Sequence, residues 1–208
     1  YQVDRIRDGR SFTTRRVVAI QHGRAIFNLS ASFHDFEAGL DYGGEPMPEV
    51  PDPETLPSFQ ERFAPYRDKI GDILDRPRPI DMRQVPPDPV LEPGVKADGQ
   101  AVWLRANGTL PADPLLHACI VTYASDLSLL DTALRPFGMN GMTNSLMMAS
   151  LDHAMWFHRP FRTDEWLLYS QRAVSSSGAR GLARGSIYTR DGHLVVSVMQ
   201  EGLIRVLE

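Results

Sequence analysis

The sequence predicts an α+β fold in which a long helix lies on a curved antiparallel sheet, with part of this arrangement present twice. Three observations predict it. Two similar stretches flank the middle of the chain, the middle is rich in proline, and one long apolar segment precedes the second stretch. With 208 residues, 42% of them hydrophobic, the chain is long enough for one large or two small globular domains.

The two flanking stretches align when the numbering is shifted by 169. The shift places Gly9 on Gly178, and the dipeptide His22-Gly23 on Asp191-Gly192. Each copy has the pattern of a strand, a turn, a second strand, a tight hairpin and a third strand. Asp-Gly between two apolar runs is a strong hairpin signal. We therefore expect residues 1–36 to be the C-terminal strands of a first copy.

The first copy begins directly at these strands, whereas in the second copy a strand and a long helix precede them. An open sheet without its covering helix would leave an apolar face in water. The pattern therefore leads us to expect that the first copy lacks its N-terminal strand and helix.

The middle of the chain, residues 37–98, is expected to be a connector. Twelve of the sixteen prolines fall between Pro46 and Pro93. Proline fixes φ and removes a hydrogen-bond donor, so neither a continuous sheet nor a long helix fits here. The spacing of the aromatic and aliphatic residues predicts one short helix over Ser58–Leu74. Because this stretch is much longer than an ordinary loop, we expect it to be packed on the fold.

The long apolar segment Pro111–Leu134 is predicted to be a helix, since prolines lie at its start and Gly138 follows its end. At 100° per residue, Asp126 lies about 80° from the centre of the apolar stripe, near the boundary between helix and sheet, whereas Ser125 points away. Asp131 lies on the opposite flank and is nearly as well placed. The predicted stripe consists of Leu116, Cys119, Ile120, Tyr123, Leu127, Leu130 and Leu134.

Strands are predicted before and after this helix, which completes the second copy over residues 99–208. One long helix on a curved antiparallel sheet is the hotdog arrangement, and two copies in one chain make a double hotdog. The predicted strands are Ala101–Leu110, Ser145–His158, Glu165–Ser175, Leu182–Arg190 and His193–Arg205.

One polar residue interrupts an apolar row in the last predicted strand. Gln200 shares a face, by period 2, with Leu194, Val196, Val198 and Ile204, whereas the matching position of the first copy is Ala31. A polar group in such a row is costly unless it is hydrogen-bonded, so the position indicates function. The alternative is a glutamine bonded to backbone at the end of the sheet. For Asp126, the alternative is a solvated carboxylate at the edge of the helix.

A third group of polar residues lies in the predicted strand Ser145–His158. By alternation, Ser150, Asp152 and His158 share one face with Met148 and Trp156, and His153 takes the other face with Leu151, Met155 and Phe157. Because Asp152 and His153 then point to opposite faces, they do not predict a dyad. A Ser-His-Asp triad stays an alternative, although no strand-to-helix elbow exposes a serine.

The composition excludes several classes of function. The net charge of −4 argues against a nucleic-acid partner, and no apolar stretch approaches the roughly 20 residues of a membrane span. A single cysteine, Cys119, excludes an internal disulfide framework and a multi-cysteine metal site. We expect a cytoplasmic protein without a metal ion or a cofactor.

Several segments resemble the acyl-CoA thioesterase II family. The resemblance is strong at both ends of the chain and weak in its proline-rich middle. The segments are Asp8–Phe12, Tyr123–Asp126, Leu151–Pro160, Glu165–Tyr169, Ala179–Gly185 and Met199–Gly202.

The resemblance implies a double hotdog that hydrolyses fatty acyl-CoA, with coenzyme A as part of the substrate. It implies that Asp126, Ser150 and Gln200 hold the hydrolytic water, with serine where many members have threonine. Met148, Trp156 and Phe157 are candidates for lining an acyl tunnel. A homo-oligomer is expected, because double hotdogs tend to pair through sheet edges. Two alternatives stay open, a non-catalytic acyl-CoA-binding hotdog and an acyl-CoA hydratase-like enzyme.

Overall fold

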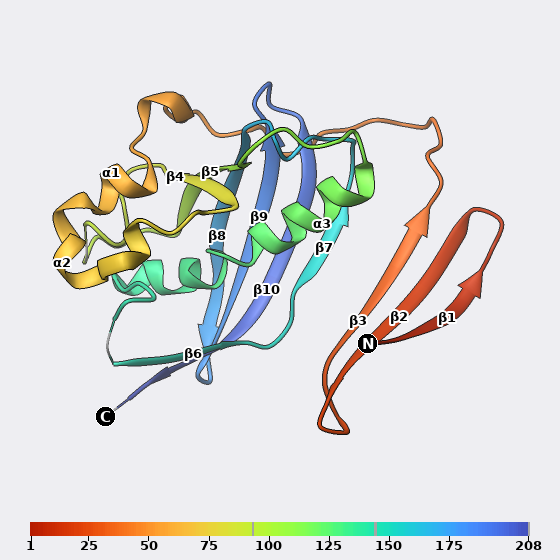
Figure 1. Cartoon of the computed structure of the whole chain (residues 1–208), viewed down its shortest axis with the longest axis horizontal. Helices are drawn as coiled ribbons and strands as arrows, with labels where there is room; N and C mark the ends of the chain where they lie inside the picture. Colours follow the sequence, from red (N-terminus) through yellow and green to blue (C-terminus); the bar gives the residue numbers. More distant parts are fainter. Residues whose placement is uncertain (93, 144, 208) are drawn as a thin grey trace. The chain divides into compact units, whose positions relative to one another are not determined.

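The computed structural model describes residues 1–92, 94–143 and 145–207. They form two compact units, one over residues 1–42 and one from residue 43 onward. The second unit therefore contains most of the proline-rich stretch together with the second copy. Figure 1 gives the labels of the helices and strands.

The first unit is a three-stranded antiparallel sheet in the order β1-β2-β3. Its strands are β1 (Gln2–Asp8), β2 (Phe12–Gln21) and β3 (Arg24–His34). The hairpin between β2 and β3 turns at His22 and Gly23, with φ of 51° and 74°. Two consecutive positive φ angles match the right-handed twist of the flanking strands. The hairpin predicted at this dipeptide is therefore confirmed.

The second unit is built on a seven-stranded sheet in the order β4-β5-β8-β9-β10-β6, and β7 also pairs with β10. All of its paired strands are antiparallel. The predicted strands are confirmed, except that the one predicted over Ser145–His158 is two separate strands. The strands are β4 (Ile80–Gln84), β5 (Gly99–Ala106), β6 (Leu146–Ser150), β7 (Ala154–Phe157), β8 (Leu167–Ser177), β9 (Arg180–Thr189) and β10 (Leu194–Val206).

The single long helix predicted over Pro111–Leu134 is wrong. The α-helix α3 (Pro114–Ser125) ends with Asp126 as its C-cap, and after a turn the 3-10 helix η4 (Leu130–Phe137) follows. Ser125, Asp126 and Ser128 favour this break, because their short polar side chains compete with the helix for backbone hydrogen bonds. The interruption matters because it places Asp126 in a turn.

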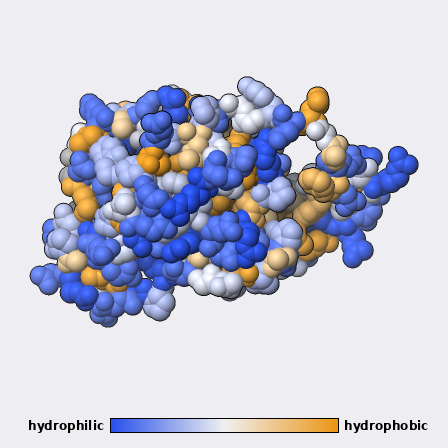
Figure 2. Space-filling view, turned by 90° about the horizontal axis from the view of Figure 1, so that it is seen from above, coloured by the Kyte–Doolittle hydropathy of each residue, from blue (hydrophilic) through white to orange (hydrophobic). Residues whose placement is uncertain are grey.

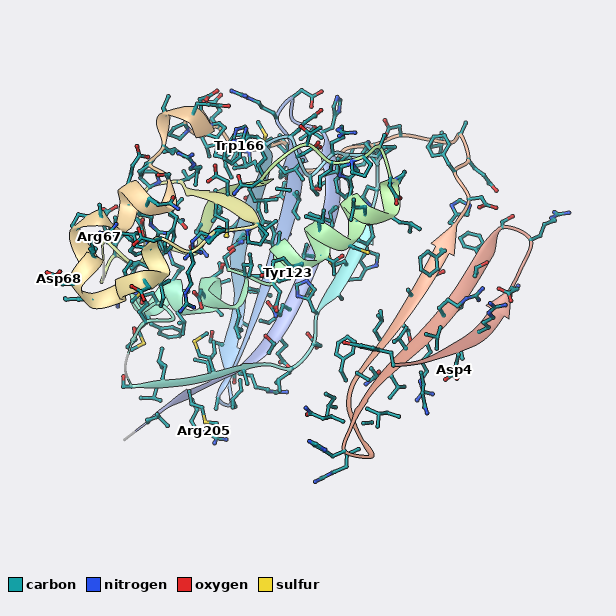
Figure 3. The ribbon with its side chains drawn as sticks, viewed as in Figure 1. Asp4, Arg67, Asp68, Tyr123, Trp166 and Arg205 are labelled. Carbon is teal, nitrogen blue, oxygen red and sulfur yellow. The ribbon has the colours of Figure 1, made fainter. Side chains whose placement is uncertain are left out.

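The buried face of α3 also differs from the predicted stripe. The helix buries His117, Val121, Ala124 and Ser125, whereas Tyr123 on the predicted stripe is 57% exposed (labelled in Figure 3). Cys119 and Leu127 are exposed as well. The helix is apolar on nearly every side, so the spacing of its apolar residues could not identify the face that packs on the sheet.

The two faces of the sheet carry separate hydrophobic clusters. On one face, α3 lies across β9 and β10 (Figure 1), and Val121 and Ala124 pack with Tyr169, Ile187 and Val198. On the other face, the proline-rich segment packs through Leu56 and Val85. The second cluster consists of Leu56, Val85, Trp103, Trp166, Leu168 and Tyr188.

The proline-rich segment is tied to the sheet by hydrogen bonds from two tryptophans. The indole Nε1 of Trp103 donates to the carbonyl of Pro51 at 2.9 Å, and that of Trp166 (labelled in Figure 3) donates to Glu54 Oε1 at 3.0 Å. Arg190 pairs with Asp52 and Glu54 at the same place. The expectation that this stretch is packed on the fold is thus confirmed, and its residues 80–84 form the strand β4.

The short helix predicted over Ser58–Leu74 is a series of separate turns. They are α1 (Phe59–Phe63), the 3-10 helix η2 (Ala64–Tyr66), α2 (Arg67–Ile70) and the 3-10 helix η3 (Gly71–Leu74), and the 3-10 helix η1 (Pro53–Thr55) precedes them. Ser58 and Glu61 form a capping box that starts α1. Pro65 and Gly71 interrupt the helical path, because proline lacks an N–H and Gly71 has φ of 54°.

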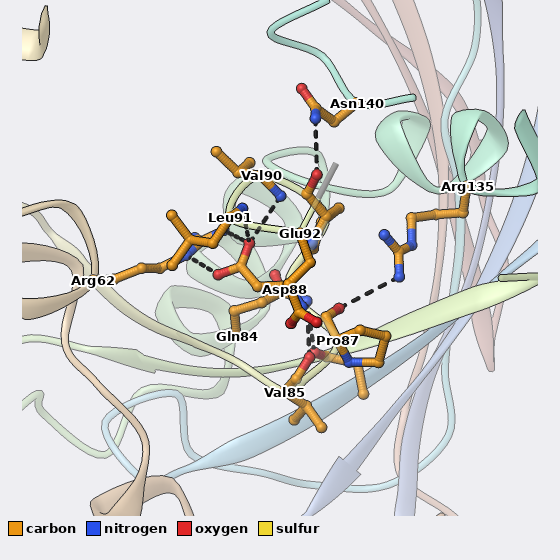
Figure 4. Close-up of polar contacts among 12 residues, drawn as sticks. Arg62, Gln84, Val85, Pro87, Asp88, Val90, Leu91, Glu92, Arg135 and Asn140 are labelled. Atoms are coloured by element: carbon orange, nitrogen blue, oxygen red, sulfur yellow. Dashed lines mark hydrogen bonds and ion pairs between the residues drawn. The ribbon is translucent and has the colours of Figure 1, made fainter. Parts of the chain in front are cut away.

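A buried ion pair holds α1 against the loop that follows β4 (Figure 4). The guanidinium of Arg62 donates through Nε and Nη2 to the two oxygens of Asp88. Asp88 Oδ1 also accepts from the backbone N–H groups of Val90 and Leu91. The two side chains are 15% and 11% exposed, so the pair is largely shielded from solvent.

The surface of the molecule is mostly hydrophilic on the face shown in Figure 2, with hydrophobic residues interspersed. Among the described residues, no helix is long and apolar enough to cross a membrane.

Candidate active site

Gln200 lies on β10 and is completely buried on the face that packs against α3. Its Nε2 donates to Asp126 Oδ1 at 2.5 Å and to Ser150 Oγ at 3.0 Å. Three residues that are far apart in sequence therefore meet at one point, at the end of α3, the end of β6 and the middle of β10. The alternative in which Gln200 is bonded to backbone is wrong, since both contacts of its Nε2 are to side chains.

The neighbours of Gln200 follow the predicted row except at one end. Val196 and Val198 belong to the cluster beneath α3, as predicted, but Leu194 packs in the cluster on the opposite face. The pairing of β9 with β10 shifts register between Leu194 and Val196. Such a bulge reverses the alternation of side chains, which a strict period of 2 does not anticipate.

The orientation of the Gln200 carboxamide follows from its partners. A carboxamide nitrogen carries two hydrogens, and these match the carboxylate of Asp126 and the hydroxyl of Ser150. The opposite orientation would place the amide oxygen against the carboxylate oxygen, and two acceptors repel one another. Gln200 Oε1 is buried and has no hydrogen-bond partner within the described ranges. Gln200 is thus a rigid donor to both groups.

Asp126 is held at one oxygen and open at the other. As the C-cap of α3 it has φ of −82° and ψ of −12°, and its side chain is 55% exposed. Oδ1 accepts from Gln200, and for Oδ2 no hydrogen bond is found among residues 1–92, 94–143 and 145–207. An oriented carboxylate with one accessible oxygen can accept a proton from a bound water molecule.

The break between β6 and β7 brings Ser150 and His153 to the same place. The N–H groups of Leu151 and Asp152 both donate to the carbonyl of Glu201, and Asp152 Oδ1 accepts from the N–H of Glu201. The chain therefore does not alternate through residues 151–153. The predicted assignment of Ser150 and His153 to opposite faces is wrong, because both reach the polar cluster at the end of α3.

The side chain of His153 lies close to both Ser125 and Asp126. Its Nε2 is 2.8 Å from Ser125 Oγ, and its Nδ1 is 3.9 Å from Asp126 Oδ1. Burial lowers the pKa of His153, against the opposing charges of Asp126 and Asp152. The imidazole is therefore neutral near pH 7. The predicted outward direction of Ser125 is also wrong, since Ser125 is fully buried.

Tyr169 of β8 fixes the last turn of α3 from the side of the sheet. Its hydroxyl donates to the carbonyl of Ser125 at 3.2 Å, and the side chain is fully buried. Burial, with a smaller contribution from the charge of Asp126, raises the pKa of Tyr169 well above its usual range. Tyr169 therefore stays neutral and donates its hydroxyl hydrogen to the backbone carbonyl of Ser125, the residue before Asp126.

The ring of Tyr169 fits only because Gly185 of β9 has no side chain. A Cβ on Gly185 would lie 2.3 Å from Cε2 of Tyr169. We expect Gly185→Ala to lower the free energy of unfolding by about 1–3 kcal/mol, the usual cost of overpacking a core. Urea unfolding would measure the loss.

A matched control for this change is Gly43→Ala, since nothing lies within 4 Å of a Cβ at Gly43. In the double variant Gly185→Ala/Tyr169→Leu the clash is absent, so we expect the two losses to be less than additive. Additive losses, or equal stability of the two alanine variants, would contradict the close packing of this pair.

A buried polar network holds the turn that follows Asp126. Gln171 Nε2 donates to Ser128 Oγ at 2.7 Å, and Thr132 Oγ1 donates to Gln171 Oε1 at 2.8 Å. Gln100 Nε2 is also within 2.8 Å of Gln171 Oε1. Two residues of β8 thus fix the chain around Asp126. Tyr169 bonds to Ser125, which precedes Asp126, and Gln171 bonds to Ser128, which follows it.

Asp131, the other carboxylate considered from the sequence, lies elsewhere. Its oxygens pack against Gly141, where an added Cβ would come within 2.8 Å of Oδ1. Burial raises the pKa of Asp131. Within the described ranges no hydrogen bond joins it to Gln200, so the structure associates Asp126 and not Asp131 with the glutamine.

The candidate acyl-lining residues lie on β6 and β7. Met148 pairs in register with Ile204, Trp156 with Ser197 and Phe157 with Val196. Phe157 stacks on Phe161, with ring centroids 6.4 Å apart. Adjacent residues of β7 point to opposite faces, so Trp156 and Phe157 do not line one surface together.

Comparison with known proteins agrees with these features. Residues 79–203 match the family model described as acyl-CoA thioesterase. Acyl-coenzyme A thioesterase 8 of Mus musculus is 38% identical over 220 residues, covering 99% of this chain and 67% of the relative. The crystal structure of an acyl-CoA thioesterase II from Mycobacterium marinum, 44% identical, matches with a TM-score of 0.76 over 98% of this chain and 72% of that chain.

A hot dog fold protein from Alicyclobacillus acidocaldarius, only 16% identical, matches with a TM-score of 0.74 over 100% of this chain and 72% of that chain. The fold is therefore that of the hotdog proteins, α+β with a curved antiparallel sheet, and the class of protein is a thioester hydrolase. The chain belongs to the acyl-CoA thioesterase family.

Proposed function

We propose that the chain hydrolyses fatty acyl-CoA to a free fatty acid and coenzyme A, using a water molecule held by Asp126, Ser150 and Gln200. The observation that carries this proposal is the pair of contacts from the buried Gln200 to Asp126 Oδ1 and Ser150 Oγ. A thioester carbonyl is already electrophilic. Its hydrolysis therefore depends on an oriented, partly deprotonated water molecule more than on a strong nucleophile.

In the proposed reaction, the accessible oxygen of Asp126 accepts a proton from the water as the water oxygen attacks the carbonyl carbon. Ser150 hydrogen-bonds to the same water, and Gln200 fixes both groups. Collapse of the tetrahedral intermediate breaks the carbon–sulfur bond, and the thiolate of coenzyme A takes up the proton. General-base catalysis of this kind is worth about 10²–10⁴-fold. It needs neither a cofactor nor a metal ion.

We further propose a double hotdog with one active site. The order β1-β2-β3 in the first unit repeats the order β8-β9-β10 in the second. Each copy has one register shift in the pairing of its last two strands. Ala31 occupies the position that Gln200 has after the shift of 169, and alanine cannot orient a carboxylate.

The acyl chain is proposed to lie along the apolar side chains beside β6 and β7. Phe157 shares the side of Met155, which packs beneath α3, and is the better candidate for contact near Asp126. Met148 lies two residues before Ser150 on the same strand and is proposed to line the channel as well. Trp156, on the opposite side of β7, is proposed to contact a more distant part of the substrate.

We also propose a cytoplasmic homo-oligomer. Within the described residues, β4 pairs only with β5, and β6 only with β10. Such edge strands present unpaired backbone groups that a second copy can meet.

The proposed function predicts thiol release from a panel of acyl-CoAs of increasing chain length. Replacing Ser150 by alanine is expected to lower kcat about tenfold, the value of one lost hydrogen bond to the water. Ser150→Thr keeps the hydroxyl and is expected to retain most of the activity. A coloured thiol reagent measures the rates.

Binding of acyl-CoA without thiol release would overturn the proposal and favour a non-catalytic binding protein. Water addition to an enoyl-CoA without thiol release would favour the hydratase-like alternative. Equal rates for Ser150→Ala and the unmodified protein would contradict the role given to Ser150.

A further inference from the structure

His153 is placed between the two residues that define the end of α3, and the resemblance to the family gave it no role. Its Nε2 is 2.8 Å from Ser125 Oγ, and its Nδ1 is 3.9 Å from the Asp126 oxygen that Gln200 holds. Its side chain is 20% exposed, but Nδ1 itself is buried and has no hydrogen-bond partner in the described parts of the chain.

The hydrogen bonds around Ser125 define which nitrogen of His153 carries the proton. A serine hydroxyl has one hydrogen, and the Oγ of Ser125 donates it to the carbonyl of Thr122 at 2.9 Å. On this basis we assign the hydrogen of the neutral ring to Nε2, which donates to Ser125 Oγ. The unprotonated Nδ1 is left facing Asp126.

We propose that His153 is a positioning residue for Asp126 whose protonation switches off the proposed base. In its neutral form, His153 anchors the end of α3 through Ser125 and leaves the carboxylate of Asp126 free to accept a proton. When Nδ1 gains a proton, the imidazolium becomes an ion-pair partner of Asp126 at a distance of 3.9 Å. The paired carboxylate accepts a proton from water less readily, and hydrolysis slows.

The charges around His153 come from three elements. Asp126, in the turn after α3, faces Nδ1, and Asp152 precedes His153 in the connection between β6 and β7. From the sheet, Gln200 contributes a neutral carboxamide, and Tyr169 stays neutral because burial raises its pKa. Burial lowers the pKa of His153, whereas the two carboxylates and, to a smaller extent, the side chain of Gln200 oppose this shift.

The direction of the pH effect follows from this balance. Because the pKa of His153 lies below its usual value, the neutral, active form is the main form above about pH 6.5. As pH falls through the pKa of His153, the imidazolium forms and kcat declines. The inference rests on the proposed role of Asp126 as the general base.

The test compares kcat against pH for the unmodified protein and for His153→Gln. Glutamine can still donate to Ser125 Oγ but does not titrate. We expect the acidic decline of kcat to move to lower pH in His153→Gln, because the residue that replaces the imidazole does not titrate. At pH 8, the two proteins should differ by less than about tenfold, the effect of one hydrogen bond.

His158→Gln is the matched control. The Nε2 of His158 is also 2.8 Å from a serine hydroxyl, Ser197 Oγ, and burial and Arg159 lower its pKa too. The carboxylates of Asp126 and Asp152 do not contribute to that shift. We therefore expect His158→Gln to leave the acidic decline where it is.

A second measurement does not depend on turnover. The titration of His153, followed by nuclear magnetic resonance, should move to lower pH in Asp126→Asn, since the neighbouring negative charge is lost. An unchanged titration in Asp126→Asn, or an unchanged acidic decline in His153→Gln, would overturn the inference. If the unmodified protein released no thiol at all, the proposed function would fail, while the titration would still report whether the two side chains interact.

Discussion

Replacing Asp126 by asparagine is expected to lower kcat for acyl-CoA hydrolysis by about 10²–10⁴-fold, the usual value of a general base. Asparagine has nearly the same shape and keeps an oxygen that can accept from Gln200 Nε2, so the geometry of the site should persist. The amide cannot take the proton of the attacking water. We expect KM to change little, because the loss is confined to the chemical step. Thiol release under saturating substrate measures it.

Asp131→Asn is the matched control for this prediction. Asp131 is also an aspartate close to the end of α3, but it packs against Gly141 and not at Gln200. Its burial raises its pKa, so the neutral asparagine should be tolerated there. We expect its kcat to equal that of the unmodified protein. If both variants lost activity equally, or if Asp126→Asn stayed active, Asp126 would not be the base.

Replacing Arg62 by methionine is expected to lower the free energy of unfolding by about 3–5 kcal/mol, the cost of removing one partner from a buried ion pair. Methionine fills much of the same space but leaves the carboxylate of Asp88 without its guanidinium. The N–H groups of Val90 and Leu91 still bond to Asp88, but two neutral donors compensate the buried charge only in part. Urea unfolding at neutral pH measures the change.

Arg67→Met in the neighbouring helix α2 is the matched control. Arg67 pairs with Asp75 at 2.8 Å, but the two side chains are 58% and 61% exposed. Solvent screens such an exposed pair, so this variant should be nearly neutral. The double variant Arg62→Met/Asp88→Asn should recover part of the loss, because the unpaired charge is gone. Equal stability of Arg62→Met and Arg67→Met would contradict the buried role of this pair.

The candidate site was partly visible in the sequence. Gln200 could be identified because its carboxamide follows Val196 and Val198 on a strand face that is otherwise apolar. In the structure it is buried and bonded to Asp126. The helical position of Asp126 made it a candidate but did not distinguish it from Asp131. Only the contact with Gln200 of β10 distinguishes Asp126 from Asp131. A helical wheel contains no information about what packs against the helix.

His153, by contrast, was assigned to the wrong face. The prediction treated residues 145–158 as one strand, and in a continuous strand Ser150 and His153 must point apart. Two N–H groups that share the carbonyl of Glu201 interrupt that strand. This interruption depends on β10, which lies about fifty residues further along the chain, so no local signal near His153 could predict it. The contact of His153 with Ser125 was hidden for the same reason.

Local patterns in the sequence by themselves determined the strands β5, β8, β9 and β10, the hairpin at His22-Gly23 and the polar interruption at Gln200. These features depend on short-range rules, namely alternation in strands and the turn preferences of glycine. Tertiary structure alone decided which face of the apolar helix α3 is buried, where that helix ends, and that Tyr169, His153 and Gln200 converge around residues 125 and 126. The physical reason is that an all-round apolar helix has no preferred face until a sheet packs on it, and polar groups brought into that core must find partners there.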